Sequence, residues 1–172
     1  MLRKLVARLF GFDEEILDLR DKVRELSWDD AYHMYTRPAF QQFAQVMPRG
    51  SRVVAFIDLD DIHRLDQELG YAEVDRRVHA MFSVPFRRSD IVARWYSGDE
   101  IVILFDSERL GAQRKMDELA VAAAAEGLEF KFDIGDWDVG KVPIEDVIEQ
   151  LSKNVMSQKG AATGEMTSKT SR

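Results

Sequence analysis

The chain has 172 residues, 45% of them hydrophobic, enough to bury one sizeable core but too few for two comfortable ones. Its formal net charge of -7 argues against DNA or RNA as a partner, although a small nucleotide held by metal ions is compatible with it. Cysteine is absent, which excludes disulfides, thiolate metal sites and cysteine nucleophiles and favours a cytoplasmic location.

The N-terminal segment has two helical patterns. Apolar residues recur at helical spacing over residues 2–10 and alternate with basic ones, which predicts a short amphipathic helix. Such a helix could touch a membrane through residues 1–10, but packing on its own domain or continuation into a coiled coil is favoured. Residues 13–26 carry a narrow apolar stripe suited to the interface of a two-helix coiled coil. We expect residues 1–28 to be a helical lead-in and the protein to be a homodimer.

The rest of the chain alternates helix and strand patterns. Helices are predicted over residues 37–46, 61–70, 72–82, 107–126 and 143–157, and strands over residues 52–58, 91–95, 101–105 and 129–134. The second and third strands flank a polar turn and form a predicted β-hairpin. This order specifies an α/β (α+β) fold with a central mixed sheet of at least four strands flanked by helices. A tail, residues 159–172, is predicted to be disordered.

Acidic residues stand at the ends of two predicted strands. Asp58 and Asp60 close the first strand, and Asp99 and Glu100 occupy the tip of the hairpin. If the hairpin lies beside the first strand, these carboxylates converge, and an all-oxygen ligand set selects Mg2+ or Mn2+. Two such cations can activate a hydroxyl and neutralise charge on an α-phosphate and its leaving pyrophosphate. The plainer alternative is that Asp58 and Asp60 cap the following helix.

Two segments together resemble GGDEF domains, the palm-fold family of diguanylate cyclases. Residues 58–75, DLDDIHRLDQELGYAEVD, resemble the family pattern D-I/L-D-x-F-K-x-x-N-D-x-x-G-H-x-x-G-D. Residues 87–101, RRSDIVARWYSGDEI, resemble its R-x-x-D element followed by GGDEF, with SGDEI in place of that motif. Shorter similarities at Asp29, residues 37–40 and residues 133–135 extend the resemblance over a domain of residues 29–158.

The resemblance implies a metal site. Asp58 and Glu100 would bind the cations, the carbonyl of Leu59 would assist, and Asp99 would be the variable acid beside Glu100. Gly98 would let the hairpin backbone approach the triphosphate, because glycine has no Cβ. The implied catalytic residues are Asp58, Asp99 and Glu100, and the implied cofactor is Mg2+ or Mn2+.

The resemblance also implies a nucleotide site, in which this chain departs from the family pattern. Asp66 and Asp75 would face the base, but Asp66 replaces an asparagine, which puts strict guanine specificity in doubt. His63 replaces a phosphate-contacting lysine, and Ser97 replaces the first glycine of the motif. Lys159 stands where the family's phosphate-binding lysine ends the last helix.

The implied activity is the condensation of two molecules of GTP, or of a related nucleoside triphosphate, into a cyclic dinucleotide by a dimer. Arg87 and Asp90 would form an inhibitory product site. Two alternatives stay open: a degenerate, inactive GGDEF domain that binds a nucleotide or cyclic di-GMP or serves dimerisation, and a palm-type cyclic oligonucleotide synthase with altered base specificity. The retained acids favour catalysis.

Overall fold

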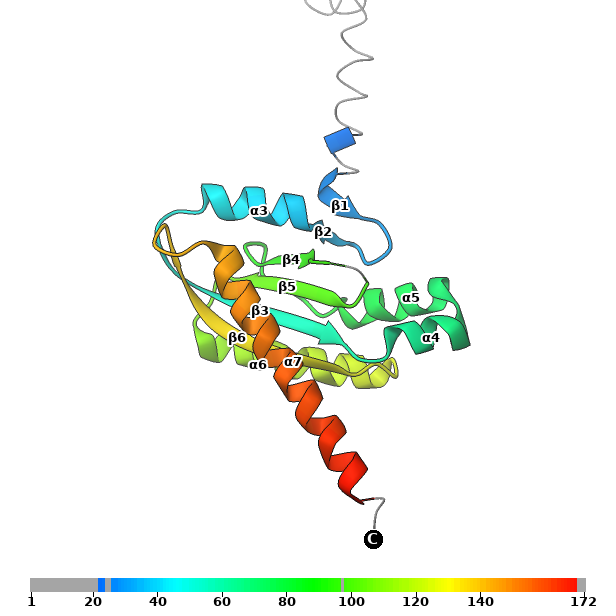
Figure 1. The fold of residues 1–172 in the computed structure, drawn as a ribbon. Coiled ribbons are helices and arrows are strands. Elements are labelled where there is room, and N and C mark those ends of the chain that lie inside the picture. The colour runs from blue at the N-terminus through cyan, green and yellow to red at the C-terminus, as the bar shows by residue number, and fades with distance from the viewer. Residues whose placement is uncertain (1–21, 24–25, 97, 170–172) are drawn as a thin grey trace, which may run out of the picture.

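The computed structural model describes residues 22–23, 26–96 and 98–169, and a mixed sheet of six strands forms their centre (Figure 1). The strand order is β1-β2-β4-β5-β3-β6, and only β2 and β4 pair in parallel. The strands are β1 (Trp28–Asp29), β2 (Met34–Thr36), β3 (Gly50–Leu59), β4 (Ile91–Arg94), β5 (Glu100–Phe105) and β6 (Phe130–Val139). The predicted fold class is thus confirmed.

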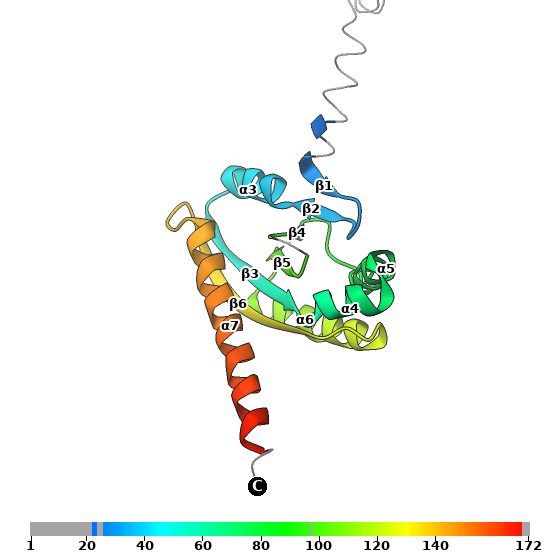
Figure 2. The same cartoon turned by 45° about the vertical axis from the view of Figure 1, so that its right-hand side comes forward.

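Helices cover both faces of the sheet (Figures 1 and 2). They are α3 (Arg37–Val46), α4 (Ile62–Leu69), α5 (Tyr71–Met81), α6 (Arg109–Ala125) and α7 (Ile144–Lys169). Every helix predicted between residues 37 and 157 is present, within two residues of its predicted start. The fold is therefore a sheet between two helical layers, as expected for alternating helices and strands.

Strand β3 divides its side chains between two cores. Its odd-numbered residues, from Val53 to Leu59, are buried with residues of α4, α5 and α6. Its even-numbered residues Val54 and Phe56 are buried with residues of α3 and α7. Because side chains alternate between the faces of a strand, a strand covered on both sides becomes a continuous apolar run. The same alternation directs the next even-numbered residue, Asp58, to the α7 layer.

Four elements, β1, β2, β6 and α7, differ clearly from the prediction. The pair β1 and β2 was not predicted, because two- and three-residue strands carry no readable alternation. Strand β6 continues to Val139, since Trp137 and Val139 are buried while Asp136 and Asp138 are exposed, a clear period of two.

Helix α7 continues to Lys169, past residue 159, where the sequence pattern placed the start of a disordered tail. The segment follows directly on an existing helix, and extending a helix adds one hydrogen bond for each residue fixed, without the cost of starting a new one. The division of the chain into a lead-in, a domain and a tail stays a prediction.

The N-terminal predictions fall largely outside the described residues. The helix predicted over residues 2–10 and most of the stripe over residues 13–26 lie there. Two members of the stripe are described, and Val23 and Leu26 are 60% and 66% exposed. Within the described ranges, no helix combines the length and apolarity needed to cross a membrane.

Candidate metal and nucleotide site

Asp58 and Glu100 lie directly opposite each other in the antiparallel pairing of β3 and β5. The Cβ atoms of directly opposed residues are about 4.5–5.5 Å apart, so the two carboxylates share one small volume where these strands meet the hairpin tip. Asp58 is only 9% exposed. The structure thus brings together acids that are separated in sequence by α4, α5 and β4, as the sequence pattern predicted.

The hairpin tip is docked on the end of β3. The N–H of Leu59 donates to the carbonyl of Asp99 at 2.9 Å, and the N–H of Trp95 donates to the carbonyl of Glu100 at 2.8 Å. Gly98 has φ +64°, a left-handed conformation that strains any residue with a Cβ. Ser97, beside it, lies outside the described residues. These bonds hold Glu100 in register with Asp58.

Lys159, on α7, reaches the acids at the end of β3. Its Nζ lies 2.6 Å from Oδ1 of Asp58 and 2.8 Å from Oδ1 of Asp60. The same nitrogen is 3.5 Å from the main-chain carbonyl oxygen of Leu59. The residue that the sequence resemblance assigned to phosphate therefore contacts two carboxylates and a carbonyl.

Burial raises the pKa of Asp58 despite its hydrogen bond to Lys159. Burial also raises the pKa of Glu100, and the nearby charges of Asp99 and Asp58 raise it further. Oε2 of Glu100 is buried and accepts no hydrogen bond from any described residue. A buried, unpaired carboxylate oxygen facing a second carboxylate is a position that a hard cation would satisfy.

The candidate cation cradle consists of the carboxylates of Asp58 and Glu100 and the carbonyl of Leu59. No group of three or more histidine or acidic side chains in the described ranges is arranged to hold a metal. The main-chain carbonyl would therefore be the third protein ligand, and water or phosphate oxygens would complete the coordination shell. The donor set is all oxygen, which fits Mg2+ or Mn2+.

Asp66 on α4 and Asp75 on α5 lie close enough for their charges to interact, and both are half-buried. Burial raises the pKa of Asp75, while the nearby Arg94 opposes the rise. Arg94 itself donates to Asp29 at 2.8 Å and stacks over the ring of Tyr32 at 4.4 Å. Sequence analysis missed Arg94 as a member of this cluster, although Asp29 belonged to the resemblance.

Of two basic residues near the acidic end of the sheet, His63 is exposed and Arg37 packs against aromatic rings. His63 is exposed on α4. The guanidinium of Arg37 contacts the rings of both Trp95 and Tyr96, at 4.6 Å and 4.4 Å from their centroids. Its charge lowers the pKa of Glu100, although burial outweighs this effect. Arg37 was not predicted as a site residue, and its pairing with the hairpin aromatics has no local sequence signal.

Arg87 and Asp90 shape a tight turn beside the end of β5. Both carboxylate oxygens of Asp90 accept main-chain N–H bonds, from Arg87 at 3.0 Å and from Asp106 at 2.9 Å. The exposed guanidinium of Arg87 donates to the carbonyl of Asp106 at 2.6 Å. Asp90 is therefore engaged by the backbone, while Arg87 has further N–H donors beyond this bond.

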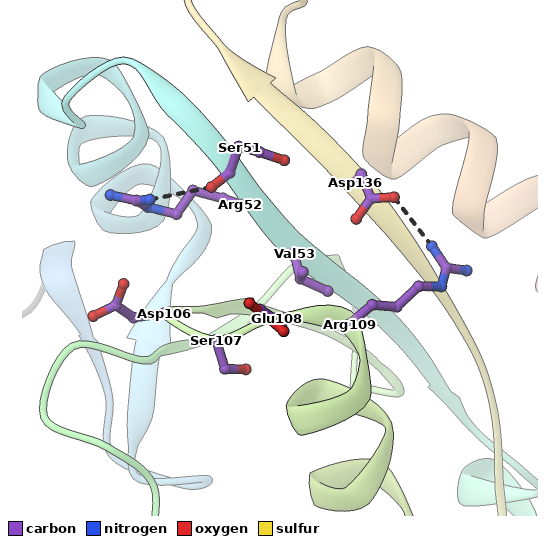
Figure 3. Close-up of a pocket in the computed structure, with 8 residues that line it drawn as sticks. All are labelled: Ser51, Arg52, Val53, Asp106, Ser107, Glu108, Arg109 and Asp136. Carbon is purple, nitrogen blue, oxygen red and sulfur yellow. Dashed lines mark hydrogen bonds and ion pairs between the residues drawn. The ribbon is translucent and has the colours of Figure 1, made fainter.

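A cavity of about 410 Å³ lies at the other end of β3 from Asp58, near the start of α6 (Figure 3). Its walls include Ser51 and Asp106, and Arg109 bridges to Asp136 at 3.5 Å. Asp58 lies six residue steps beyond Arg52 along the extended strand, which corresponds to about 20 Å. This cavity is therefore distinct from the candidate cation cradle.

The fold is that of GGDEF domains. The coiled coil and GGDEF domain of DgcB from Caulobacter crescentus, in complex with c-di-GMP, matches with TM-score 0.69 and 17% identity over 91% of this chain and 95% of that one. The diguanylate cyclase SiaD from Pseudomonas aeruginosa, in complex with its activator SiaC, matches with TM-score 0.62 and 18% identity over 93% of this chain and 68% of that one. The FimX GGDEF domain from Pseudomonas aeruginosa matches with TM-score 0.62 and 17% identity over 77% of this chain and 94% of that one.

These identities are low, so the matches establish the fold and leave the chemistry to be argued from the site. Neither family models nor curated protein sequences match the chain. The sequence resemblance to GGDEF domains is thus confirmed by structure over most of the chain.

Removing the negative charge of Glu100, by protonation or by substitution, is predicted to stabilise the folded protein. Because its folded pKa lies above the ordinary value of 4.5, its ionisation disfavours the folded state, and this penalty disappears as pH falls through the folded pKa. Glu100→Gln should stabilise the protein by about 1 kcal/mol at pH 7, with the difference narrowing toward pH ~4.

Urea denaturation in EDTA, which removes bound divalent cations, measures this effect. The exposed Glu129→Gln is the matched control and should leave stability unchanged. A Glu100→Gln protein that is less stable than the parent at pH 7 would contradict the prediction.

Proposed function

We propose that this chain is a nucleotide cyclase of the diguanylate cyclase type, which condenses two molecules of GTP or a related nucleoside triphosphate into a cyclic dinucleotide. One observation carries the proposal: Asp58 and Glu100 oppose each other across β3 and β5, and a buried oxygen of Glu100 lacks a described partner. Burying like charges side by side is costly. Such an arrangement is typical of a site that works with a bound cation.

Asp58, Glu100 and the carbonyl of Leu59 would hold Mg2+ or Mn2+. When bound, the metal supplies positive charge to a triphosphate and lowers the pKa of an attacking hydroxyl. Asp99 adds negative charge beside Glu100 and strengthens the attraction of the cradle for cations. Gly98, in its left-handed conformation, allows the hairpin backbone to approach phosphate oxygens closely.

The base would lie toward α4 and α5, where Asp66 and Asp75 supply hydrogen-bond acceptors. Each 3′-hydroxyl attacks the α-phosphate of the other nucleotide, and the two new phosphodiester bonds release two pyrophosphates. Two active sites must therefore face each other, and we propose a homodimer in which each subunit presents one nucleotide. His63, Ser97 and Lys159 would complete the nucleotide site.

We propose that Arg87 and Asp90 form a secondary site for the cyclic dinucleotide. The exposed guanidinium of Arg87 supports this role, because its free donors can engage a planar base or a phosphate. The DgcB and other GGDEF domains were solved with c-di-GMP, which makes this ligand the first to test.

A second candidate function is an inactive receptor for a nucleotide or cyclic dinucleotide. It is favoured by the contacts of Lys159, which occupies the acids that catalysis needs, and by Asp66 and His63 in place of the family's asparagine and lysine. A cyclic oligonucleotide synthase with altered base choice would share the metal chemistry and differ at Asp66. The cytoplasm is the proposed location.

If the protein is a cyclase, it should form a cyclic dinucleotide when it is incubated with a metal ion and a nucleoside triphosphate. Purified protein with Mg2+ or Mn2+ and each nucleoside triphosphate in turn should yield a cyclic dinucleotide, detected by mass spectrometry. Asp58→Asn and Glu100→Gln should each lower its formation at least about a hundredfold. Asp117→Asn, an exposed acid on α6, is the control and should retain activity. Product absent with every triphosphate, together with binding of c-di-GMP, would support the receptor instead.

If Asp66 contacts the base of the nucleotide, Asp66→Asn should change the preference between GTP and ATP. An ionised carboxylate offers only acceptors, so Asp66 should repel O6 of guanine and accept from the amine of adenine. Supplying an amide donor should shift the ratio of GTP to ATP binding toward GTP by about ten- to a hundredfold. Competition binding measures this ratio, with Asp61→Asn, at the N-cap of the same helix, as the control. An unchanged ratio would mean that Asp66 does not read the base.

A further inference from the structure

The ammonium of Lys159 occupies the place that a cation would take at the end of β3. It lies 2.6 Å from Asp58, 2.8 Å from Asp60 and 3.5 Å from the carbonyl oxygen of Leu59. Asp58 and the Leu59 carbonyl are also two of the three groups in the proposed metal cradle. The lysine therefore takes up Oδ1 of Asp58 and approaches the Leu59 carbonyl, two of the oxygen atoms that a divalent cation in the cradle would use.

The packing of α7 explains how the lysine reaches this position. Ile148, Leu151 and Val155 form a buried stripe at helical spacing on the side of α7 that faces the sheet. Lys159 is the next position of that stripe, four residues beyond Val155. Along the strand beneath, Val54 and Phe56 are followed by Asp58. Where the apolar face of the strand ends in an acid, the apolar face of the helix ends in a lysine.

An ordinary surface ion pair does not account for the whole arrangement. The side chain of Asp58 is only 12% exposed and that of Lys159 is 32% exposed, so the contact is shielded from water. Glu100 stands opposite Asp58, and its buried Oε2 receives no bond from Lys159 or any other described residue. The ammonium thus compensates the charges of Asp58 and Asp60 and leaves the charge of Glu100 without a hydrogen-bonded partner at its buried oxygen.

We infer that Lys159 is a tethered cation that occupies the metal cradle and must be displaced before a divalent cation can bind there. The inference rests on the proposed function, because it takes the cradle to be a metal site. Two cations cannot share the same oxygens of Asp58 without strong repulsion. Metal binding therefore moves the ammonium away from Asp58, where its tether on α7 keeps it close enough to meet triphosphate oxygens. Lys159 is in this way an autoinhibitory contact that a metal–nucleotide complex releases.

Removal of the lysine charge tests the inference directly. Lys159→Met and Lys159→Gln should each bind Mn2+ at least about tenfold more tightly than the parent protein, because no cation then competes for Asp58. Lys159→Arg retains the charge and should stay closer to the parent than either neutral variant. Lys153→Met, an exposed lysine paired with Glu149 on the same helix, is the matched control and should match the parent.

Mn2+ binding is measured by electron paramagnetic resonance without nucleotide, at pH ~8 so that carboxylates are ionised. Equal or weaker binding by both neutral variants, relative to the parent, would overturn the inference while leaving the proposed metal site standing. No binding by any of the proteins would overturn both. A thermal melt of each variant checks that the fold is retained, and agreement between the methionine and glutamine variants excludes an effect of side-chain shape.

Discussion

The pairing of Asp58 with Glu100 is the constraint on which the rest of the site depends. Two carboxylates are placed side by side at the ends of central strands, where water is largely excluded and like charges repel. Among the described residues, Asp58 is the only charged one that is buried. Lys159 compensates part of the charge, and one oxygen of Glu100 is left without a described partner. We infer from this arrangement that a cation binds here during function.

Several features of the fold serve to hold these charges in place. The bond from Leu59 to Asp99 fixes the hairpin tip to the end of β3. The packing of the apolar stripe of α7 on the sheet places Lys159 next to the end of β3. Arg37, which contacts the rings of Trp95 and Tyr96, places a second positive charge near Glu100. Each contact connects segments distant in the sequence, so the site forms only when the whole domain has folded.

The sequence was sufficient to predict the layered fold, because long apolar runs and helical periodicities report burial directly. It also predicted that Asp58 and Glu100 converge, since a hairpin beside a strand leaves few other places for them. It could not predict contacts between side chains whose only connection is tertiary packing. The stacking of His33 on His79, with ring centroids 4.1 Å apart, is one example, and the insertion of Lys159 between Asp58 and Asp60 is another. Local patterns carry no information on such pairs.

We propose that Asp58, Leu59 and Glu100 form a cradle for a divalent cation, and that Lys159 occupies Asp58 until that cation binds. A crystal structure of the protein with Mn2+ and a non-hydrolysable nucleoside triphosphate, with the metal located by anomalous scattering, tests it most directly. The account predicts a metal peak about 2.1–2.2 Å from oxygens of Asp58 and Glu100, with the ammonium of Lys159 moved away from Asp58. A peak elsewhere, or a lysine still bonded to Asp58 beside an occupied nucleotide site, would contradict it.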